Sequence, residues 1–272
     1  MPRYSVITTC KGRLADLRRS LPQFLKQDDA EVIVVDYDCP DGTAEFARTA
    51  YGSVKLVSVR NQPLFNASHA RNLGAAHASA DLLVFLDADV VVADDFLQSL
   101  RFPAGMKTYG IFRREEGNSL RGSCVVRRED FEEIEGYDEL LTGYEGEDLD
   151  LYMRLRNAGA VAVVLGTERI VEVIDQNDDE RFRFRPGNVQ KQFLRGQLYQ
   201  LAKETMLGAL RAKKLSLETR KNILEKIDMQ VESLFEGEKD FELTINFPDR
   251  YRRGLLKRWE FSTAVTVRAR RI

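Results

Sequence analysis

Two spacings of apolar residues alternate over the first half of the chain. Short runs rich in β-branched residues predict buried strands. These runs cover residues 4–9, 31–37, 54–59 and 82–88. Between them, apolar residues recur at intervals of three and four, as at Leu14, Leu17 and Leu21, which predicts helices. Because single helices separate the strands, the pattern predicts an open, mostly parallel α/β sheet flanked by helices.

The second half of the chain follows a different pattern. A strand leading into a short charged helix is predicted over residues 122–131, and a glycine-rich loop followed by a helix over residues 135–159. Two further strand-like runs follow at residues 160–165 and 169–175. Beyond about residue 186 the spacing is helical and contains no strand-like run of comparable strength.

The length of the chain agrees with a division into two parts. Its 272 residues suffice for one large domain and a smaller appendage. We predict an α/β domain over residues 1–185 and a helical C-terminal extension over residues 186–272, which ends in a basic tail.

Composition and charge restrict the class of protein. The chain is 43% hydrophobic and 31% charged, which is typical of a globular protein rather than a disordered one. Its net charge of −2 gives no general attraction to nucleic acid, so no nucleic-acid partner is expected. No apolar run approaches the roughly 18 residues of a membrane span, and no secretion signal precedes the first strand. We therefore expect a cytoplasmic protein.

A pair of carboxylates follows the fourth predicted strand, in "LLVFLDADVVVADD" at residues 82–95. In a parallel sheet, ligands collect at the carboxyl ends of the strands. A turn there can aim Asp87 and Asp89 at one cation, and carboxylate oxygens suit Mg²⁺ or Mn²⁺. The alternative is that these acids are loop and N-cap residues before the next helix.

A second group of acids opens the helix predicted after the glycine-rich loop. Glu145, Glu147, Asp148 and Asp150 fall within six positions. Carboxylates at a helix N-terminus are stabilised in the ionised form, so one of them can act as a general base toward a hydroxyl. Capping explains one acid easily, but it explains less well why four repelling acids lie together.

Five ordered stretches together resemble the family-2-type glycosyltransferases with the A-type nucleotide-diphospho-sugar fold. The resemblance runs over about residues 4–175, and the stretches read "SVITTCKGR", "VIVVDYDCPDGT", "FNASHARNLGAAHASADLLVFLDAD", "SCVVRREDFEEIEGYDE" and "YEGEDLDLYMRLRNAG". The last two look especially like bacterial chondroitin-polymerase modules and galactosyl- or N-acetylgalactosaminyltransferases.

The resemblance implies roles for five residues on the donor side. Thr8 and Arg13 would lie near the nucleotide, and Asp36 at its base or ribose. Arg71 would approach the uracil or the diphosphate, and Asp87 the ribose and the water shell of the metal.

The resemblance also implies the metal and acceptor residues. Asp89 would bind Mn²⁺ or Mg²⁺ directly, together with Asp87. Asp148 would deprotonate the acceptor hydroxyl, while Glu147 orients the acceptor sugar.

The chain departs from the family pattern at two places. The second aspartate usual at the end of the second strand is Tyr37 here. The late histidine that often serves as a third metal ligand is missing, and Asp175 is the substitute we expect. His69 and His77 both precede the Asp87–Asp89 pair, and we interpret them as packing or surface residues, with His69 the closer to the nucleotide.

The combined prediction is a metal-dependent glycosyltransferase that moves a sugar from a UDP-sugar to a saccharide or lipid-linked acceptor with inversion, in polysaccharide or glycolipid synthesis. The basic segment 250–272, which includes Trp259, would allow peripheral contact with the inner face of a membrane. Two alternatives remain. One is a phosphatase of the haloacid-dehalogenase type with Asp87 as nucleophile, and the other is a non-catalytic nucleotide-sugar-binding protein.

Overall fold

The computed structural model describes most of the chain and divides it into two compact units. The described residues are 2–103, 105–113, 120–185, 187–236, 241–248 and 262–269. Residues 1–143 and 147–187 form one unit, called here the N-terminal unit. Residues 144–146 and 188–272 form the other, the C-terminal unit. The tripeptide 144–146 therefore belongs by its contacts to the second unit, although the first unit surrounds it in sequence.

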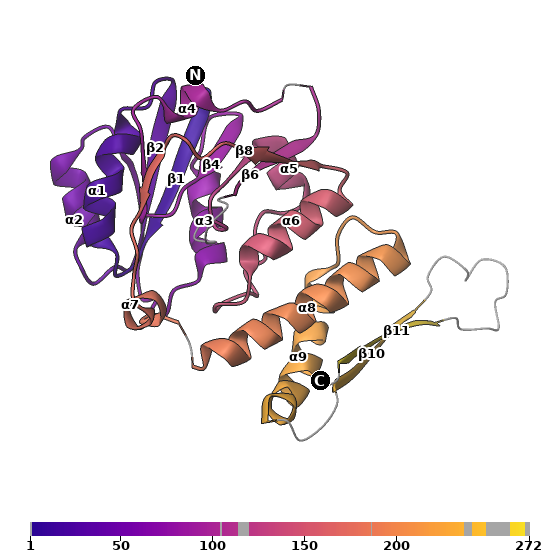
Figure 1. The fold of residues 1–272 in the computed structure, drawn as a ribbon. Coiled ribbons are helices and arrows are strands. Elements are labelled where there is room, and N and C mark those ends of the chain that lie inside the picture. Colours follow the sequence, from indigo (N-terminus) through magenta and orange to yellow (C-terminus); the bar gives the residue numbers. More distant parts are fainter. Residues whose placement is uncertain are drawn as a thin grey trace. The chain divides into compact units, whose positions relative to one another are not determined.

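A seven-stranded sheet is the centre of the N-terminal unit (Figure 1). Its strands are β1 (Tyr4–Cys10), β2 (Ala30–Tyr37), β3 (Lys55–Val59), β4 (Leu82–Phe85), β6 (Thr108–Phe112), β7 (Cys124–Arg127) and β8 (Val161–Leu165). They follow the order β3-β2-β1-β4-β7-β6-β8. Only β7 runs antiparallel to its neighbours in this sheet, while the other adjacent pairs are parallel. The predicted open, mostly parallel sheet is confirmed.

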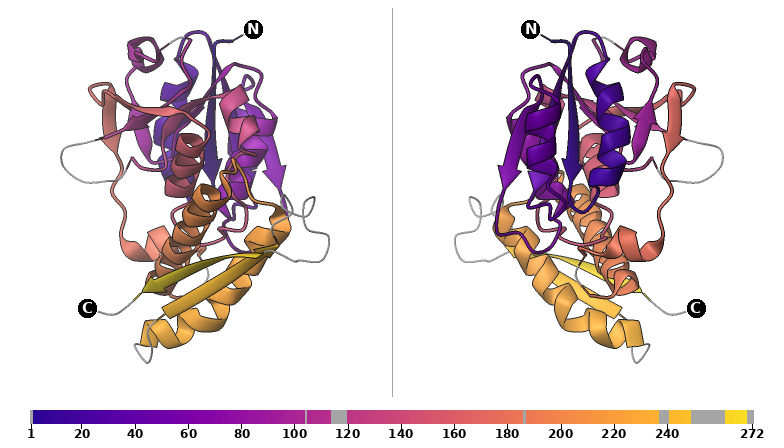
Figure 2. Two further views of the ribbon diagram at one scale, coloured as in Figure 1. Left: turned by 90° about the vertical axis from the view of Figure 1, so that its right-hand side faces the viewer. Right: turned by 90° about the vertical axis from the view of Figure 1, so that its left-hand side faces the viewer.

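Helices cover both faces of this sheet (Figure 2). The helices of the N-terminal unit are α1 (Leu14–Leu25), α2 (Thr43–Ala50), α3 (Ala67–Ala76), α4 (Phe96–Ser99), α5 (Arg128–Glu133), α6 (Glu147–Asn157) and α7 (Asp178–Phe182). Neighbouring residues of β1 point to opposite faces. Val6 packs in a cluster with Leu17 of α1, and Ile7 in another with Ala70 of α3 and Leu151 of α6. Burial on both faces explains why these strands are apolar runs rather than alternating ones.

The carboxylate pair lies in a turn rather than in a strand. β4 ends at Phe85, three residues earlier than the sequence predicts, and the amide of Val90 donates to the carbonyl of Asp87 at 3.1 Å. The short strand β5 (Val90–Val92) then begins and pairs antiparallel with β9 (Ile170–Val173). The turn thus leaves the main sheet at the edge where the parallel strands end.

Three polar loops meet at that edge because β2, β1 and β4 are adjacent and parallel. A buried lysine, Lys11 after β1, joins the loops after β2 and β3. Its Nζ atom donates to the carbonyls of Asp38 and Gln62 at 2.9 and 2.6 Å. The loops at these strand ends therefore form one polar rim.

The C-terminal unit holds two long helices, α8 (Val189–Leu210) and α9 (Leu217–Glu236), as the sequence predicts. It also holds an antiparallel pair of strands where we expected helix, β10 (Phe241–Pro248) and β11 (Ser262–Ala269). The helical expectation is wrong there, because apolar and polar residues alternate from Phe241 to Phe247, which is the period of a strand rather than of a helix. Of the basic segment 250–272, residues 250–261 and 270–272 lie outside the described residues.

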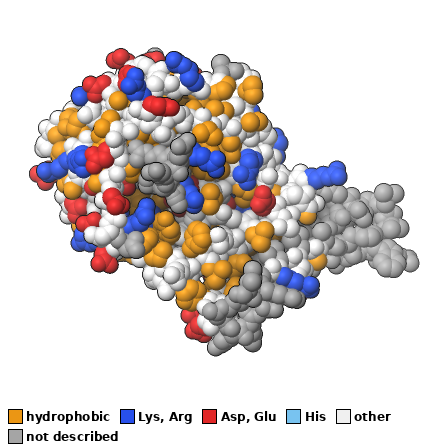
Figure 3. Space-filling view, in the orientation of Figure 1, with side chains coloured by type: hydrophobic (Ala, Val, Ile, Leu, Met, Phe, Trp, Pro, Cys, Tyr) orange, Lys and Arg blue, Asp and Glu red, His pale blue; other side chains and the backbone are white. Residues whose placement is uncertain are grey.

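Side chains of both charge signs are interspersed on the face of the molecule in Figure 3, in keeping with the balanced composition. Within the part of the chain that the structure describes, no helix is both long and apolar enough to cross a membrane.

Glu31 of β2 joins three elements on one side of the sheet. Its carboxylate accepts from the hydroxyls of Ser5 and Ser79 at 2.6 and 2.8 Å and forms an ion pair with Lys55 of β3. Burial alone would raise the pKa of Glu31, but the Lys55 ammonium and the two serines outweigh it and lower the pKa to about 2.

We expect Glu31→Gln to lower the free energy of unfolding at pH 7 by about 1–3 kcal/mol, because charge-assisted hydrogen bonds are lost. A carboxylate whose pKa is depressed on folding stabilises above its unfolded pKa and loses that contribution as the pH falls through the folded value. The gap between wild type and variant should therefore close from about pH 4.5 toward about pH 2. Urea unfolding at several pH values measures it, with exposed Glu45→Gln as control. A gap that stays constant with pH would contradict the assignment.

Candidate functional site

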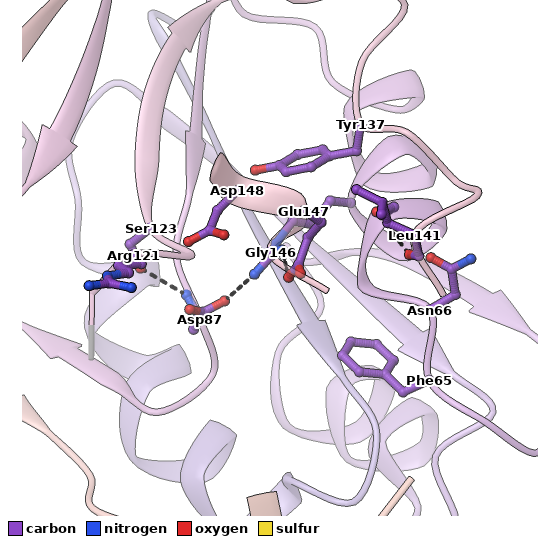
Figure 4. A network of polar contacts seen from close by, with 12 residues as sticks. Phe65, Asn66, Asp87, Arg121, Ser123, Tyr137, Leu141, Gly146, Glu147 and Asp148 are labelled. Carbon is purple, nitrogen blue, oxygen red and sulfur yellow. Dashed lines mark hydrogen bonds and ion pairs between the residues drawn. The ribbon is translucent and has the colours of Figure 1, made fainter. Parts of the chain in front are cut away.

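A single buried guanidinium connects the carboxylate turn to the start of the acidic helix. Figure 4 shows the carboxylates of Asp87, Glu147 and Asp148 in this region. Arg71 of α3 pairs through Nη2 with Asp87 Oδ1 at 2.8 Å and through Nη1 with Glu147 Oε1 at 2.9 Å. Its side chain is only 8% exposed, and its guanidinium lies 5.3 Å from the ring centroid of Tyr137. The Asn66 side chain caps α3 by accepting from the amide of His69 at 3.0 Å. Two acidic segments about 60 residues apart in sequence thus share one cation.

Burial makes the loss of any one of these three charges strongly destabilising, because removing one partner of a buried ion pair leaves an uncompensated charge. Burial alone would raise the pKa of Glu147, but Arg71 first and Arg185 second outweigh it and lower the pKa. Glu147 is therefore held ionised against Arg71. Arg185 is itself fixed by a hydrogen bond to the carbonyl of Gly143 at 3.0 Å.

The next residue, Asp148, has the opposite electrostatic character. Burial first and the charge of Glu147 second raise the pKa of Asp148 to about 6. Its Oδ1 accepts from the amide of Leu149 at 2.9 Å, and none of the described ion pairs includes it. Two adjacent carboxylates with pKa values moved in opposite directions are the usual mark of divided roles in an acid–base site. In Figure 4 both side chains extend from the start of α6 toward the turn that holds Asp87.

Asp150, two residues further along the same helix, has a structural role. It is fully buried and pairs with Arg154 Nε at 2.7 Å. Arg154 also donates to the carbonyls of Ile134 and Gly136 at 2.8 and 2.6 Å, so this pair fastens α6 to the preceding loop.

The chemistry of the carboxylate turn fits a divalent cation. Burial first and Asp87 second raise the pKa of Asp89 to about 7. Its Oδ1 is buried and has no hydrogen-bond partner among the described residues. A buried acidic oxygen without a partner calls for an explanation, and Mg²⁺ or Mn²⁺ would supply the missing charge. Asp87 and Asp89 therefore fit a metal ion.

The third metal ligand stays a prediction. Among the described residues, no group of three His, Cys, Asp or Glu side chains is placed to hold a metal. The segment after β9 does reach the turn, because the amide of Ile174 donates to the carbonyl of Asp89 at 2.8 Å. The side chain of Asp175 itself is exposed and accepts from the amide of Gln176 at 3.0 Å.

Arg71 and Asp87, two of the five residues predicted for the donor, are part of this network. The other three, Thr8, Arg13 and Asp36, make no described hydrogen bond or ion pair with Arg71, Asp87 or Glu147, although the charge of Arg13 acts to lower the pKa of Asp89. Thr8 is fully buried, with no hydrogen-bond partner for its hydroxyl in the described structure. Asp36 is buried and accepts from the amide of Cys39 at 3.0 Å and from Arg60 at 2.8 Å. Arg13 pairs with Asp16 at 3.6 Å. Their nucleotide roles remain predictions.

The two histidines have structural partners, which agrees with their interpretation from sequence. The hydroxyl of Tyr37 lies 2.8 Å from His69 Nδ1, and the buried Tyr37 ring packs edge-on against Phe65 and His69. His77 Nδ1 lies 2.9 Å from the carbonyl of Leu73 within its own helix. The residue that replaces the family's second aspartate therefore packs inside the rim.

Sequence reasoning misses Gly122, which the fold places against the centre of the network. A Cβ added at this glycine would overlap Asp87 Oδ2 and lie 2.7 Å from Arg71 Nη2. The next residue, Ser123, accepts through its hydroxyl from the amide of Asp87 at 3.4 Å. No local signal could reveal this glycine's role, since its contacts come from the turn after β4 and from α3.

We expect Gly122→Ala to force Asp87 away from Arg71 and to cost about 1–3 kcal/mol of unfolding free energy, as overpacking of a close-packed site does. Thermal denaturation measures the loss. Gly52→Ala is the matched control, because an added Cβ there meets nothing within 4 Å. Equal melting temperatures for the two variants would show that the site relaxes around the methyl group.

Two family models match adjacent parts of the chain. The model of glycosyl transferase family 2 matches residues 5–111, which include β1 through most of β6. The model described as the N-terminal domain of galactosyltransferase matches residues 111–173, which include Gly122 and the acidic start of α6. The carboxylate turn and the acidic helix thus belong to two matched regions that meet at Ile111.

Curated relatives match a limited stretch. Validoxylamine A glucosyltransferase of Streptomyces hygroscopicus subsp. jinggangensis is 33% identical over 105 residues, which is 37% of this chain and 25% of the relative. The enzyme of the same name from subsp. limoneus is 33% identical over 105 residues, with 23% of its length covered. The aligned stretch thus amounts to about a quarter of these relatives' length.

Solved structures show the same fold over most of the chain. The mannosyltransferase PcManGT from Pyrobaculum calidifontis, in complex with GDP-Man and Mn²⁺, has a TM-score of 0.58 at 18% identity and covers 85% of this chain and 70% of its own. S. aureus TarS 1–349 has a TM-score of 0.56 at 16% identity, covering 86% and 72%. Glucosyl-3-phosphoglycerate synthase from Mycobacterium tuberculosis, in complex with Mn²⁺, UDP and phosphoglyceric acid, has a TM-score of 0.53 at 17% identity, covering 73% and 78%.

Proposed function

We propose that the chain is a glycosyltransferase of the family-2 type with the A-type fold, which transfers a sugar from a UDP-sugar to an acceptor hydroxyl with the aid of Mn²⁺ or Mg²⁺. One observation carries the proposal. Arg71 joins the carboxylate turn to the acidic helix and leaves Asp148, with a pKa of about 6, beside the ionised Glu147. In this proposal the turn is the donor half of the site and the start of α6 is the acceptor half.

The donor half consists of the turn and the rim around it. Asp87 and Asp89 would hold the metal ion, and the partnerless oxygen of Asp89 supports this assignment. A bound Mn²⁺ or Mg²⁺ would offset the charge of the departing diphosphate. Neighbouring structures whose titles include Mn²⁺ with GDP-Man or UDP support a metal and a nucleotide donor in general terms. Asp175 would be a further ligand of the metal ion.

The acceptor half is the start of α6. Asp148 would take the proton of the acceptor hydroxyl while that oxygen bonds to the anomeric carbon and the bond from this carbon to the diphosphate breaks. Direct displacement of this kind inverts the anomeric configuration. Glu147, held by Arg71, would orient the acceptor sugar next to the base.

In this proposal the transferred group is a hexosyl or N-acetylhexosaminyl residue, and the acceptor is a saccharide or a lipid-linked acceptor. Peripheral membrane contact through the basic segment 250–272 belongs to the proposal, although most of that segment lies outside the described residues.

The two alternatives are less well supported by the site. A haloacid-dehalogenase-type mechanism needs Asp87 as a nucleophile, yet Asp87 Oδ1 is paired with a buried guanidinium. That mechanism also leaves the raised pKa of Asp148 without a use. A non-catalytic binding protein would not need a carboxylate poised near neutral pH at the site.

We expect Asp148→Asn to reduce sugar transfer at least about 100-fold, because the general base is lost, and to leave UDP binding unchanged. In the wild type, transfer should be low below about pH 6 and reach a plateau above it, since the base must be ionised. UDP release and a thermal-shift titration with UDP measure the two effects. Exposed Asp81→Asn serves as control. Near-normal transfer by Asp148→Asn would refute the assignment of the base.

We expect Asp89→Ala to abolish the manganese-dependent part of nucleotide binding. A ligand at 100 times its dissociation constant stabilises the folded state by about 2.7 kcal/mol, so UDP with Mn²⁺ should raise the wild-type melting temperature and EDTA should cancel the rise. Asp94→Ala, an exposed acid five residues further on that pairs with Lys26, should behave as wild type. A wild-type protein that responds to no UDP-, GDP- or dTDP-sugar would count against the whole proposal.

A further inference from the structure

The three residues directly before the acid pair are held by the C-terminal unit. Residues 144–146 group with residues 188–272, whereas Glu147 and the rest of α6 group with the N-terminal unit. The amide of Tyr144 donates to Gln192 Oε1 at 2.7 Å. Gln200 Nε2 donates to the carbonyls of Glu145 and Gly146 at 2.9 and 2.8 Å. Three backbone groups of the tripeptide are thus bound by two glutamines of α8.

A buried ion pair adds a charged contact. Glu145 is 3% exposed, and its Oε1 lies 2.7 Å from Arg195 Nη1. The same guanidinium makes a two-point contact with Asp228 of α9, at 2.6 Å from Nε and 3.0 Å from Nη2. Burial alone would lower the pKa of Arg195, but Asp228 and Glu145 outweigh it, so the cation is firmly retained. Arg195 therefore fixes Glu145 to both long helices.

The backbone contact is closer than any other residue type would allow. A Cβ added at Gly196 would overlap the carbonyl oxygen of Glu145 and lie 2.8 Å from its carbonyl carbon. A glycine inside a helix costs about 1 kcal/mol relative to alanine, so this position of α8 indicates a packing requirement. The sequence alone marks Gly196 only as a helix-weakening residue.

The anchored tripeptide ends where the proposed acceptor half begins. Gly146 has a φ of 76°, in the left-handed region, and Glu147 follows as the first residue of α6. One peptide bond therefore separates the anchored backbone from Glu147, and Asp148 comes next. A small displacement of the tripeptide must move the start of α6 or strain Gly146.

We propose that Arg195, Gly196 and Gln200 are positioning residues for the transfer reaction, through which the C-terminal unit sets the position of Asp148. The inference rests on the proposed function of Asp148 as base. Its physical basis is that a misplacement of about 1 Å at a reacting group can cost about 100-fold in rate, while the groups proposed to bind the donor, Asp87 and Asp89, lie in the turn after β4 and not in the anchored segment. The C-terminal unit would thus contribute to proton transfer through the backbone of residues 144–146.

The test compares two alanine substitutions in the same helix. Gly196→Ala inserts a methyl group against Glu145, whereas Gly208→Ala inserts one that meets nothing within 4 Å. We expect Gly196→Ala to lower kcat at least about tenfold, with the KM for the nucleotide sugar and the UDP-induced thermal shift within about twofold of wild type. Gly208→Ala should match wild type. Hydrogen exchange of peptides over residues 144–150 should be faster in Gly196→Ala only.

The outcomes separate this inference from the proposed function. Normal kcat in a folded Gly196→Ala protein, or an equal loss of kcat and of nucleotide binding, overturns the positioning role. If Gly196→Ala does not fold, Gln200→Ala provides the milder variant, with the same split between kcat and KM expected. If the wild type neither transfers sugar nor responds to nucleotides, the proposed function fails. Hydrogen exchange still shows in that case whether the anchor exists.

Discussion

The buried guanidinium of Arg71, paired with Asp87 on one side and Glu147 on the other, is the interaction on which the rest of the site depends. Separating either carboxylate from Arg71 is strongly unfavourable, because the Arg71 side chain is 8% exposed and the separation would leave a buried charge unpaired. The pair fixes the turn after β4 relative to the start of α6. It also requires a glycine at position 122, since a side chain there would displace both partners.

Three of the four acids that lie together around the start of α6 are each paired with an arginine. Glu145 is paired with Arg195 within the C-terminal unit, Glu147 with Arg71, and Asp150 with Arg154. Asp148 is in none of the described ion pairs, and burial together with its ionised neighbour raises its pKa to about 6. With its neighbours paired to arginines, Asp148 is left with a pKa that allows it to exchange a proton near neutral pH, which a capping role alone does not require.

Local pattern predicts those parts of the fold that depend on local physics. The first three strands and their parallel neighbour β4 are visible as apolar runs, because a strand buried on both faces cannot be polar on either. The strands β10 and β11 are not continuous apolar runs, and the alternation of apolar and polar residues over 241–247, which is typical of a half-buried strand, does not fit the helix that we expected there. The sequence pattern predicts that the fourth strand continues to Ala88, whereas β4 ends at Phe85, because the signal for a strand's end is weaker than the signal for its core.

The sequence by itself determined the class of sheet, the rim at which polar loops gather, and the residue types available there for metal and proton chemistry. These follow from the periods of strand and helix and from the chemistry of carboxylates. Only the tertiary structure decided which of the acids are paired with an arginine. The different surroundings of Glu147 and Asp148 depend on the position of Arg71, 76 residues before Glu147, and the surroundings of Glu145 depend on Arg195, 50 residues later. Charges shift pKa values through space and not along the chain, so the family resemblance could suggest Asp148 as the base, but no local pattern could reveal how its pKa is set.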